Sequence, residues 1–238
     1  MIKTSTLLLI ITCMTACSSA PEITPGKGAI YGTISAESHK AILAKASKKK
    51  NGIYGSVGGL IFTNQMVNYP KLKELFVCLL DPSSKGGNEH LLIATNDNMS
   101  LSSLAVGTGD RLTIQNDSSE TLTFFLAGKE EDIQVYSPVK PGERSSLVLE
   151  LEGDLELGSD ENESLQTILL SRRGLIGQQH SSGDQYVFEN LHPGQYKFLF
   201  WYWRLGLVEK NLIIKAGENI ELNQVLSVDK ILESKNEP

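Results

Sequence analysis

The sequence predicts an all-β protein built from β-sandwiches. Short apolar runs rich in β-branched and aromatic residues recur at regular spacing from Phe76 onward, and clusters of Gly, Asn, Asp, Ser and Pro separate them. Such even spacing is typical of sandwiches. Helix-forming composition is confined to residues 37–50, where Ala, Leu and Lys precede a stop at Asn51-Gly52.

Composition limits the function classes. The 238 residues are 40% hydrophobic and 21% charged, which fits a folded protein rather than a disordered one. The length allows one large or two small β-rich domains. The formal net charge of −6 argues against nucleic acid as a partner, because a phosphate-binding face needs an excess of Lys and Arg.

The N-terminus resembles a bacterial lipoprotein signal. Lys3 gives a positive start, residues 7–12 form an apolar run too short to span a bilayer, and Ala16 precedes Cys17. The resemblance implies that residues 1–16 are a signal peptide and that Cys17 carries the acyl chains, palmitate among them, that anchor the protein in a membrane.

The residues after the anchor refine this expectation. Ser18 and Ser19 follow the cysteine instead of Asp, which by resemblance to the sorting pattern indicates the outer membrane of a bacterial cell envelope, with periplasm at its inner side. Residues 17–28 then form a tether, polar over its second half. A plain secretory signal with an incidental Cys17 is the alternative.

The first strands come next. Residues 29–34 alternate and favour a strand, and residues 51–57 repeat their pattern. Between them, the lysines at 48–50 are either a solvated helix end or a contact with anionic lipid headgroups. Residues 75–80 hold Cys78, whose apolar flanks predict a buried core cysteine, with a metal ligand or redox thiol as the alternative.

Later elements follow at even spacing. Apolar and acidic residues alternate over 147–157, which is typical of strand with one wet face, before an acidic turn at 158–163. Residues 174–183 are a polar stretch. The predicted strands are residues 91–94, 101–106, 111–115, 121–126, 133–136, 145–151, 165–170, 185–188, 194–202, 211–214 and 220–226.

The C-terminal part resembles a carboxypeptidase-regulatory-like module. Residues 183–198 carry a Tyr-Val-Phe strand, a Leu-His-Pro-Gly turn and a Tyr-Lys-Phe strand, and residues 215–222 resemble the closing turn and last strand. Pro193 and Gly194 supply the tight turn. The resemblance implies a transthyretin-like, carbohydrate-binding-like sandwich over 171–228, with a tail at 229–238.

The middle of the chain is similar to the cupredoxin segment of methylamine-utilization-type periplasmic proteins. Residues 104–117, with Pro141-Gly142-Glu143 downstream, carry the resemblance, which implies a Greek-key sandwich over 91–170. Residues 29–90 then form an N-terminal β region that holds the first strands of the regulatory-like module.

The copper ligands of that family are missing. The resemblance places the first His at Leu122 and the later Cys, His and Met at Gly158, Glu161 and Ser164. None of the four matches the thiolate, imidazoles and thioether of such a site. Tyr202 also stands where the family often has His. We therefore expect no metal and no cofactor.

Two other groups of residues have the chemistry of a metal or catalytic site, but their spacing does not favour one. A divergent copper site would need at least three of a scattered set to meet, namely Cys78, His90, Met99, His180 and His192. The acidic cluster could bind calcium or serve as paired carboxylates, but its spacing favours a solvated edge that blocks aggregation; it comprises Asp154, Glu156, Asp160, Glu161 and Glu163. No catalytic motif occurs, so we expect no enzyme.

The best candidate binding face is an aromatic run, Trp201, Tyr202, Trp203 and Arg204. Alternate strand residues face opposite sides, and an exposed face of this kind would bind a sugar or a protein. The alternative is that one face is core and the other packs on the neighbouring domain. The function expected is a non-enzymatic envelope lipoprotein that binds a protein or glycan partner, the alternative being a divergent periplasmic copper protein for electron transfer.

Overall fold

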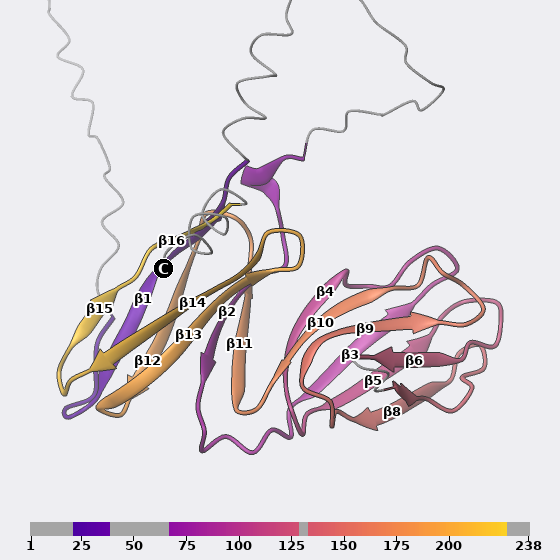
Figure 1. Cartoon of the computed structure of the whole chain (residues 1–238), viewed down its shortest axis with the longest axis horizontal. Helices are drawn as coiled ribbons and strands as arrows, with labels where there is room; N and C mark the ends of the chain where they lie inside the picture. The colour runs from indigo at the N-terminus through magenta and orange to yellow at the C-terminus, as the bar shows by residue number, and fades with distance from the viewer. Residues whose placement is uncertain (1–20, 39–66, 129–132, 228–238) are drawn as a thin grey trace, which may run out of the picture.

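The computed structural model describes residues 21–38, 67–128 and 133–227, and these form strands, turns and one short 3-10 helix, η2 (Tyr69–Lys71). The strands build four sheets (Figure 1). No helix within the described residues is long and apolar enough to cross a membrane. The predicted all-β class is confirmed.

Two sheets form what we call the C-terminal sandwich. The outer sheet has the order β12-β1-β15, with β16 also on β1, and consists of β1 (Gly28–Ala36), β12 (Asp184–Leu191), β15 (Asn219–Glu221) and β16 (Gln224–Leu226). The shared sheet has the order β11-β2-β13-β14 and consists of β2 (Leu75–Leu80), β11 (Leu175–His180), β13 (Gly194–Tyr202) and β14 (Gly206–Ile214). Phe198 and Phe200 are fully buried in the core of this sandwich.

The other two sheets form the middle sandwich. The long sheet has the order β4-β10-β9-β6-β7 and consists of β4 (Ser103–Gly107), β6 (Phe124–Ala127), β7 (Ile133–Val135), β9 (Gly153–Ser159) and β10 (Thr167–Arg172). The small sheet has the order β3-β5-β8 and consists of β3 (Glu89–Ala94), β5 (Arg111–Asn116) and β8 (Arg144–Val148). In Figure 1 this sandwich lies at the opposite end of the molecule from β1 and β15.

The centre of the shared sheet, formed by β2 and residues 198–202 of β13, is buried on both faces and joins the two sandwiches. In β2, Val77 faces the C-terminal core, whereas Phe76 and Cys78 face the middle core. Strands covered on both sides need continuous apolar sequence, and residues 75–80 have it. Each large side chain buried here contributes about 1.5–3 kcal/mol relative to an exposed one.

Hydrogen bonds to the Glu74 carboxylate also connect the two sandwiches. Glu74 precedes β2 in a left-handed conformation (φ 60°), and its Oε2 accepts hydrogen bonds from Ser102 and Ser103 at the start of β4. The backbone N–H groups lie at 3.1 and 2.9 Å and the hydroxyls at 2.6 and 3.2 Å. This contact fixes β4 relative to β2.

Most predicted strands are confirmed, with the following main differences. β14 begins at Gly206 rather than at residue 211. Residues 174–183 were expected to be a polar stretch, but they contain β11, an edge strand whose polar side chains face water. β8 ends at Val148 rather than at Leu151. The strand expected over 220–226 is divided, because Asn223 Oδ1 accepts the hydrogen bond of the Thr33 N–H at 2.8 Å in place of a backbone carbonyl.

The predicted domain limits can be placed on these strands. Residues 29–90 supply β1 and β2, which pair with strands from the C-terminal part of the chain. The limits after residues 90 and 170 fall within β3 and β10. The helix predicted for residues 37–50 lies almost entirely, and the strand predicted for 51–57 entirely, outside the described residues.

Candidate functional surfaces

The end of the middle sandwich where the resemblance expects copper is filled by apolar side chains. Leu122 is buried and bridged to Val139, and Leu165 is fully buried in the same middle core. Tyr136 and Met99 are buried in the same core. Apolar and aromatic side chains therefore occupy the interior at this end, and the one buried hydroxyl among them, that of Tyr136, has no hydrogen-bond partner among the described residues.

The segment expected to carry the later ligands does lie next to Leu122. The Asp160 N–H donates to the Thr123 carbonyl at 3.1 Å, and Glu161 Oε2 accepts from the Thr123 N–H at 2.7 Å and the Ser159 hydroxyl at 3.0 Å. Desolvation works to raise the pKa of Glu161, but these hydrogen bonds outweigh it and lower the pKa. The Glu161 carboxylate is thus engaged by the fold, and the donor set does not fit copper.

The three described histidines lie in different parts of the structure and contact different residues. His90 Nε2 lies 2.9 Å from Asp110 Oδ2, and this carboxylate, 2% exposed, also accepts from the Gly107 N–H at 2.8 Å. His192 lies at a turn beside Lys27, whose Nζ is 2.6 Å from its Nε2. His180 is on β11, where burial lowers its pKa although the Asp184 charge opposes this.

Cys78, the cysteine among the described residues, is likewise not placed to bind a metal. Cys78 is fully buried in β2, and desolvation raises its pKa. Across the parts of the chain that the structure describes, no three His, Cys, Asp or Glu side chains gather where they could hold a metal ion. The convergence that the divergent copper site requires is therefore not present in these residues.

The acidic cluster is spread along one sheet rather than gathered. Asp154 Oδ1 lies 3.1 Å from Arg172 Nη2, and Glu156 accepts a hydrogen bond from Gln166 at 2.6 Å. Both residues lie on the exposed side of β9. These two side chains are solvated as predicted, but β9 lies between β10 and β6 in the long sheet. They therefore form an exposed face and not the sheet edge that the spacing predicts, so the prediction is wrong in this respect.

The aromatic run does not form one exposed face, which corrects the predicted binding face. β13 ends at Tyr202, so Trp203 and Arg204 lie in the following turn. Trp201 is buried in the middle core, 5.6 Å from the Phe76 ring, and Tyr202 is buried in the C-terminal core. Trp203 packs partly on both cores, with the Arg204 guanidinium 4.3 Å from its ring centre. These contacts match the alternative prediction for the aromatic run, in which one face is core and the other packs on the neighbouring domain.

An exposed apolar strand lies elsewhere, in β7. Ile133 and Val135 are 59% and 62% exposed and share one face of the long sheet. Their partners on β6 are Ala127 and Phe125, and the Phe125 ring lies over Gly158. Because β7 ends the order of the long sheet, its outer backbone groups have no neighbouring strand among the described residues. The sequence predicts this strand, over residues 133–136, but it does not predict that the apolar side chains of the strand are exposed.

A groove of about 270 Å³ lies on the outer sheet. Pro21 from the tether and Tyr31, Gln185, Val187 and Glu189 from β1 and β12 line it, together with Gly32 and Tyr186. The Asn219 amide donates to the Pro21 carbonyl at 3.0 Å. The groove is therefore formed between the tether and the outer face of the sheet.

The fold and these surfaces define an all-β protein of two joined sandwiches. No protein-family model matches the chain, and no curated protein matches it. Among solved structures it is similar to a mutant of reduced amicyanin, with 11% identity over 40% of this chain and 91% of that chain (TM-score 0.32). It is also similar to a purple cupredoxin from Nitrosopumilus maritimus, with 17% identity over 34% of this chain and 98% of that chain (TM-score 0.31). These neighbours are cupredoxins, and the likeness is too low to assign a function to this chain.

Proposed function

We propose that this chain is a non-enzymatic lipoprotein of the bacterial cell envelope, anchored in the outer membrane through Cys17. Its middle sandwich is a metal-free, cupredoxin-like scaffold that binds a partner. The partner is a protein or glycan of the envelope, and the described surfaces favour a protein.

The filled end of the middle sandwich is the observation that carries this proposal. Leu122 and Leu165 occupy its interior, and Glu161 is committed to Thr123 and Ser159. A copper centre needs imidazole and thiolate ligands on a common centre, and opening this apolar core to admit them would cost the burial of at least two leucines. The scaffold is therefore complete without metal, so its use is through its surfaces.

The β7 strand supports a protein partner. Its exposed Ile133 and Val135, and its position at the edge of the long sheet among the described strands, are the features that bind an extended segment by strand addition. Glu156 lies on the same face of the sheet, across β6 from Ile133. We expect the bound segment to alternate apolar and basic residues.

Acyl labelling tests the anchor. Cells that express the full chain are fed a palmitate analogue, and the protein is isolated by a C-terminal tag. We expect label on the natural chain, none on the Cys17→Ser variant, and retention of label on Cys78→Ser, because Cys78 is buried in the core. Absence of label from the natural chain would contradict the lipoprotein assignment.

Site-specific photo-cross-linking in intact cells tests the partner. A photoreactive side chain at Val135 is compared with one at Ile213, which is equally exposed at 62% but lies on β14. We expect a discrete protein adduct at position 135 that Ile133→Asp abolishes and no such adduct at 213. Equal adducts at the two positions, or none at 135, would contradict the β7 site.

A further inference from the structure

The tether is pinned to the outer sheet close to Cys17. Beyond the bond from Asn219 to Pro21, the Thr24 hydroxyl donates to the Asn190 side-chain oxygen at 2.6 Å. The Gly217 N–H donates to the Lys27 carbonyl at 2.7 Å. Residues from Pro21 onward are therefore part of the fold rather than a free linker.

Chain length then limits how far the anchor lies from this surface. Four residue steps separate Cys17 from Pro21, and an extended chain covers at most about 3.6 Å per residue. The backbone of Cys17 is thus within about 14 Å of Pro21. A lipid-bearing cysteine sits at the headgroup layer, so the membrane surface must come equally close to Pro21.

Pro21 itself lies on the outward face of the outer sheet. It lines the groove with Tyr31 and Val187, which are cross-strand partners on that face. The opposite face carries Ile30 and Phe188 into the core. Figure 1 shows β1, β12 and β15 at one end of the molecule and the middle sandwich at the other.

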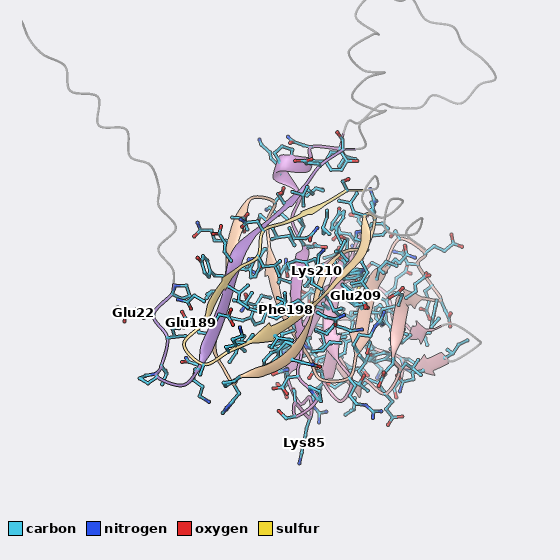
Figure 2. The ribbon with its side chains drawn as sticks, turned by 60° about the vertical axis from the view of Figure 1, so that its left-hand side comes forward. Glu22, Lys85, Glu189, Phe198, Glu209 and Lys210 are labelled. Atoms are coloured by element: carbon cyan, nitrogen blue, oxygen red, sulfur yellow. The ribbon has the colours of Figure 1, made fainter. Side chains whose placement is uncertain are left out.

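The face also has the chemistry of a particular lipid surface. Tyr31 is partly exposed and Val187 is 37% exposed, and tyrosine is enriched at membrane interfaces because its ring is apolar and its hydroxyl polar. Glu189 and Glu221 share the face of Tyr31 and Val187, because Glu221 pairs with Tyr31 and Glu189 is two residues from Val187 on one strand. The strands of the outer sheet contain no Lys or Arg. In Figure 2, Glu189 lies on the same side of the molecule as Glu22 of the tether. Such a face attracts ammonium groups and repels anionic lipids.

We propose that the outer face of the outer sheet, centred on Tyr31 and Val187, docks on the headgroups of the membrane that holds the anchor, and that ethanolamine headgroups are its partner. This inference rests on the proposed acylation of Cys17. It gives the protein a fixed orientation, in which the middle sandwich with its β7 strand projects away from the bilayer.

Nitroxide labels measure the orientation. The acylated full chain is reconstituted into vesicles rich in phosphatidylethanolamine that also contain a lipid with a nickel chelate on its headgroup. Single cysteines replace Val187, Ile213 or Val135, three exposed aliphatic residues on different sheets or ends of the molecule. Cys78 is buried and does not take up label.

We expect the nickel lipid to relax the label at 187 severalfold more than the label at 135. The label at 213 should fall between them, because the neighbouring Ile214 approaches Gly28 at the start of β1. Equal relaxation at 187 and 135 in vesicle-bound protein would overturn the orientation and leave the anchor intact. Failure of the natural chain to sediment with the vesicles would overturn the anchor, and with it the docked face.

Two further comparisons separate docking from simple proximity. If the face binds headgroups, insertion of ten Gly and Ser residues after Ser19 should leave the nickel-induced relaxation of the label at 187 unchanged. Adding the charge of Tyr31→Asp to that extended chain should then reduce this relaxation severalfold. Loss of the signal on insertion alone would overturn the docked face. Replacement of phosphatidylethanolamine by phosphatidylglycerol should weaken the signal at 187, and an unchanged signal would overturn the ethanolamine assignment.

Discussion

Glu74 is predicted to hold the two sandwiches together, and its replacement should have a defined cost. In Glu74→Ala the four donors of Ser102 and Ser103 lose their acceptor. Ser102 is at the surface, where water replaces the carboxylate, but Ser103 is fully buried. Leaving two buried donors unpaired costs about 1–3 kcal/mol each, and water entry at this partly exposed contact reduces the sum to about 2–3 kcal/mol.

Two variants sharpen the test. Glu74→Gln keeps one neutral acceptor and loses only the charge assistance, so we expect a cost of about 1 kcal/mol. Glu152→Ala is the matched control. Glu152 Oε1 lies 3.3 Å from Arg173 Nε in an exposed ion pair, whose loss should cost less than about 0.5 kcal/mol.

Urea unfolding of the soluble chain from Ser18 onward provides the free energy of unfolding. Tryptophan fluorescence should follow the contact directly, because Trp201 lies in the core that joins the sandwiches. If Glu74→Ala unfolds within about 0.5 kcal/mol of the natural chain, the carboxylate does not support this contact and the reasoning fails.

Other predictions concern single positions. Asp110→Asn should lower the free energy of unfolding by about 2–4 kcal/mol, because the buried carboxylate accepts hydrogen bonds from the Gly107 and Asn88 N–H groups and contacts His90 Nε2. A loss below about 1 kcal/mol would contradict this. Gly174→Ala should cost at least about 2 kcal/mol, because its φ is 68° and a Cβ would strike the Asp81 carbonyl; Gly183→Ala, also left-handed but in open space, should cost less. Burial lowers the pKa of His180, so folding favours the neutral imidazole; the resulting stability is full above the ordinary pKa of 6.5 and is lost as the pH falls below it. The urea midpoint of the natural chain should therefore fall between about pH 7.5 and 5.5, and His180→Gln should make this fall smaller. An unchanged pH dependence in the variant would refute this. Native Cys78 should resist a thiol reagent until urea unfolds the chain, and fast labelling of the native protein would contradict its burial.

Local periodicity explains why most of the strands are predictable. Residues 75–80 and 198–202 are apolar or aromatic without interruption, and both segments lie in strands covered on two faces. β11 escapes prediction because Gly177, Gln178 and Gln179 carry no apolar alternation, although they form part of an edge strand. Its pairing with β2 depends on residues about one hundred positions away.

The candidate surfaces are less predictable because they depend on what covers each face. Trp201 and Tyr202 have the composition of a binding site, yet the middle sandwich covers one and the outer sheet covers the other. The juxtaposition of Leu122 with residues 158–164 was expected from the resemblance, and the Asp160–Thr123 hydrogen bond shows it. The groove at Pro21 joins segments more than 160 residues apart and has no local sequence signal.

Copper stoichiometry tests the central claim most directly, because the account holds that Leu122, Leu165 and Glu161 complete this sandwich without metal. The soluble chain is expressed with copper, zinc and iron supplied, purified without chelators, and analysed for each element. We predict no stoichiometric metal and no change in the free energy of unfolding on addition of copper. One tightly held copper per chain that stabilises the native state would contradict the account.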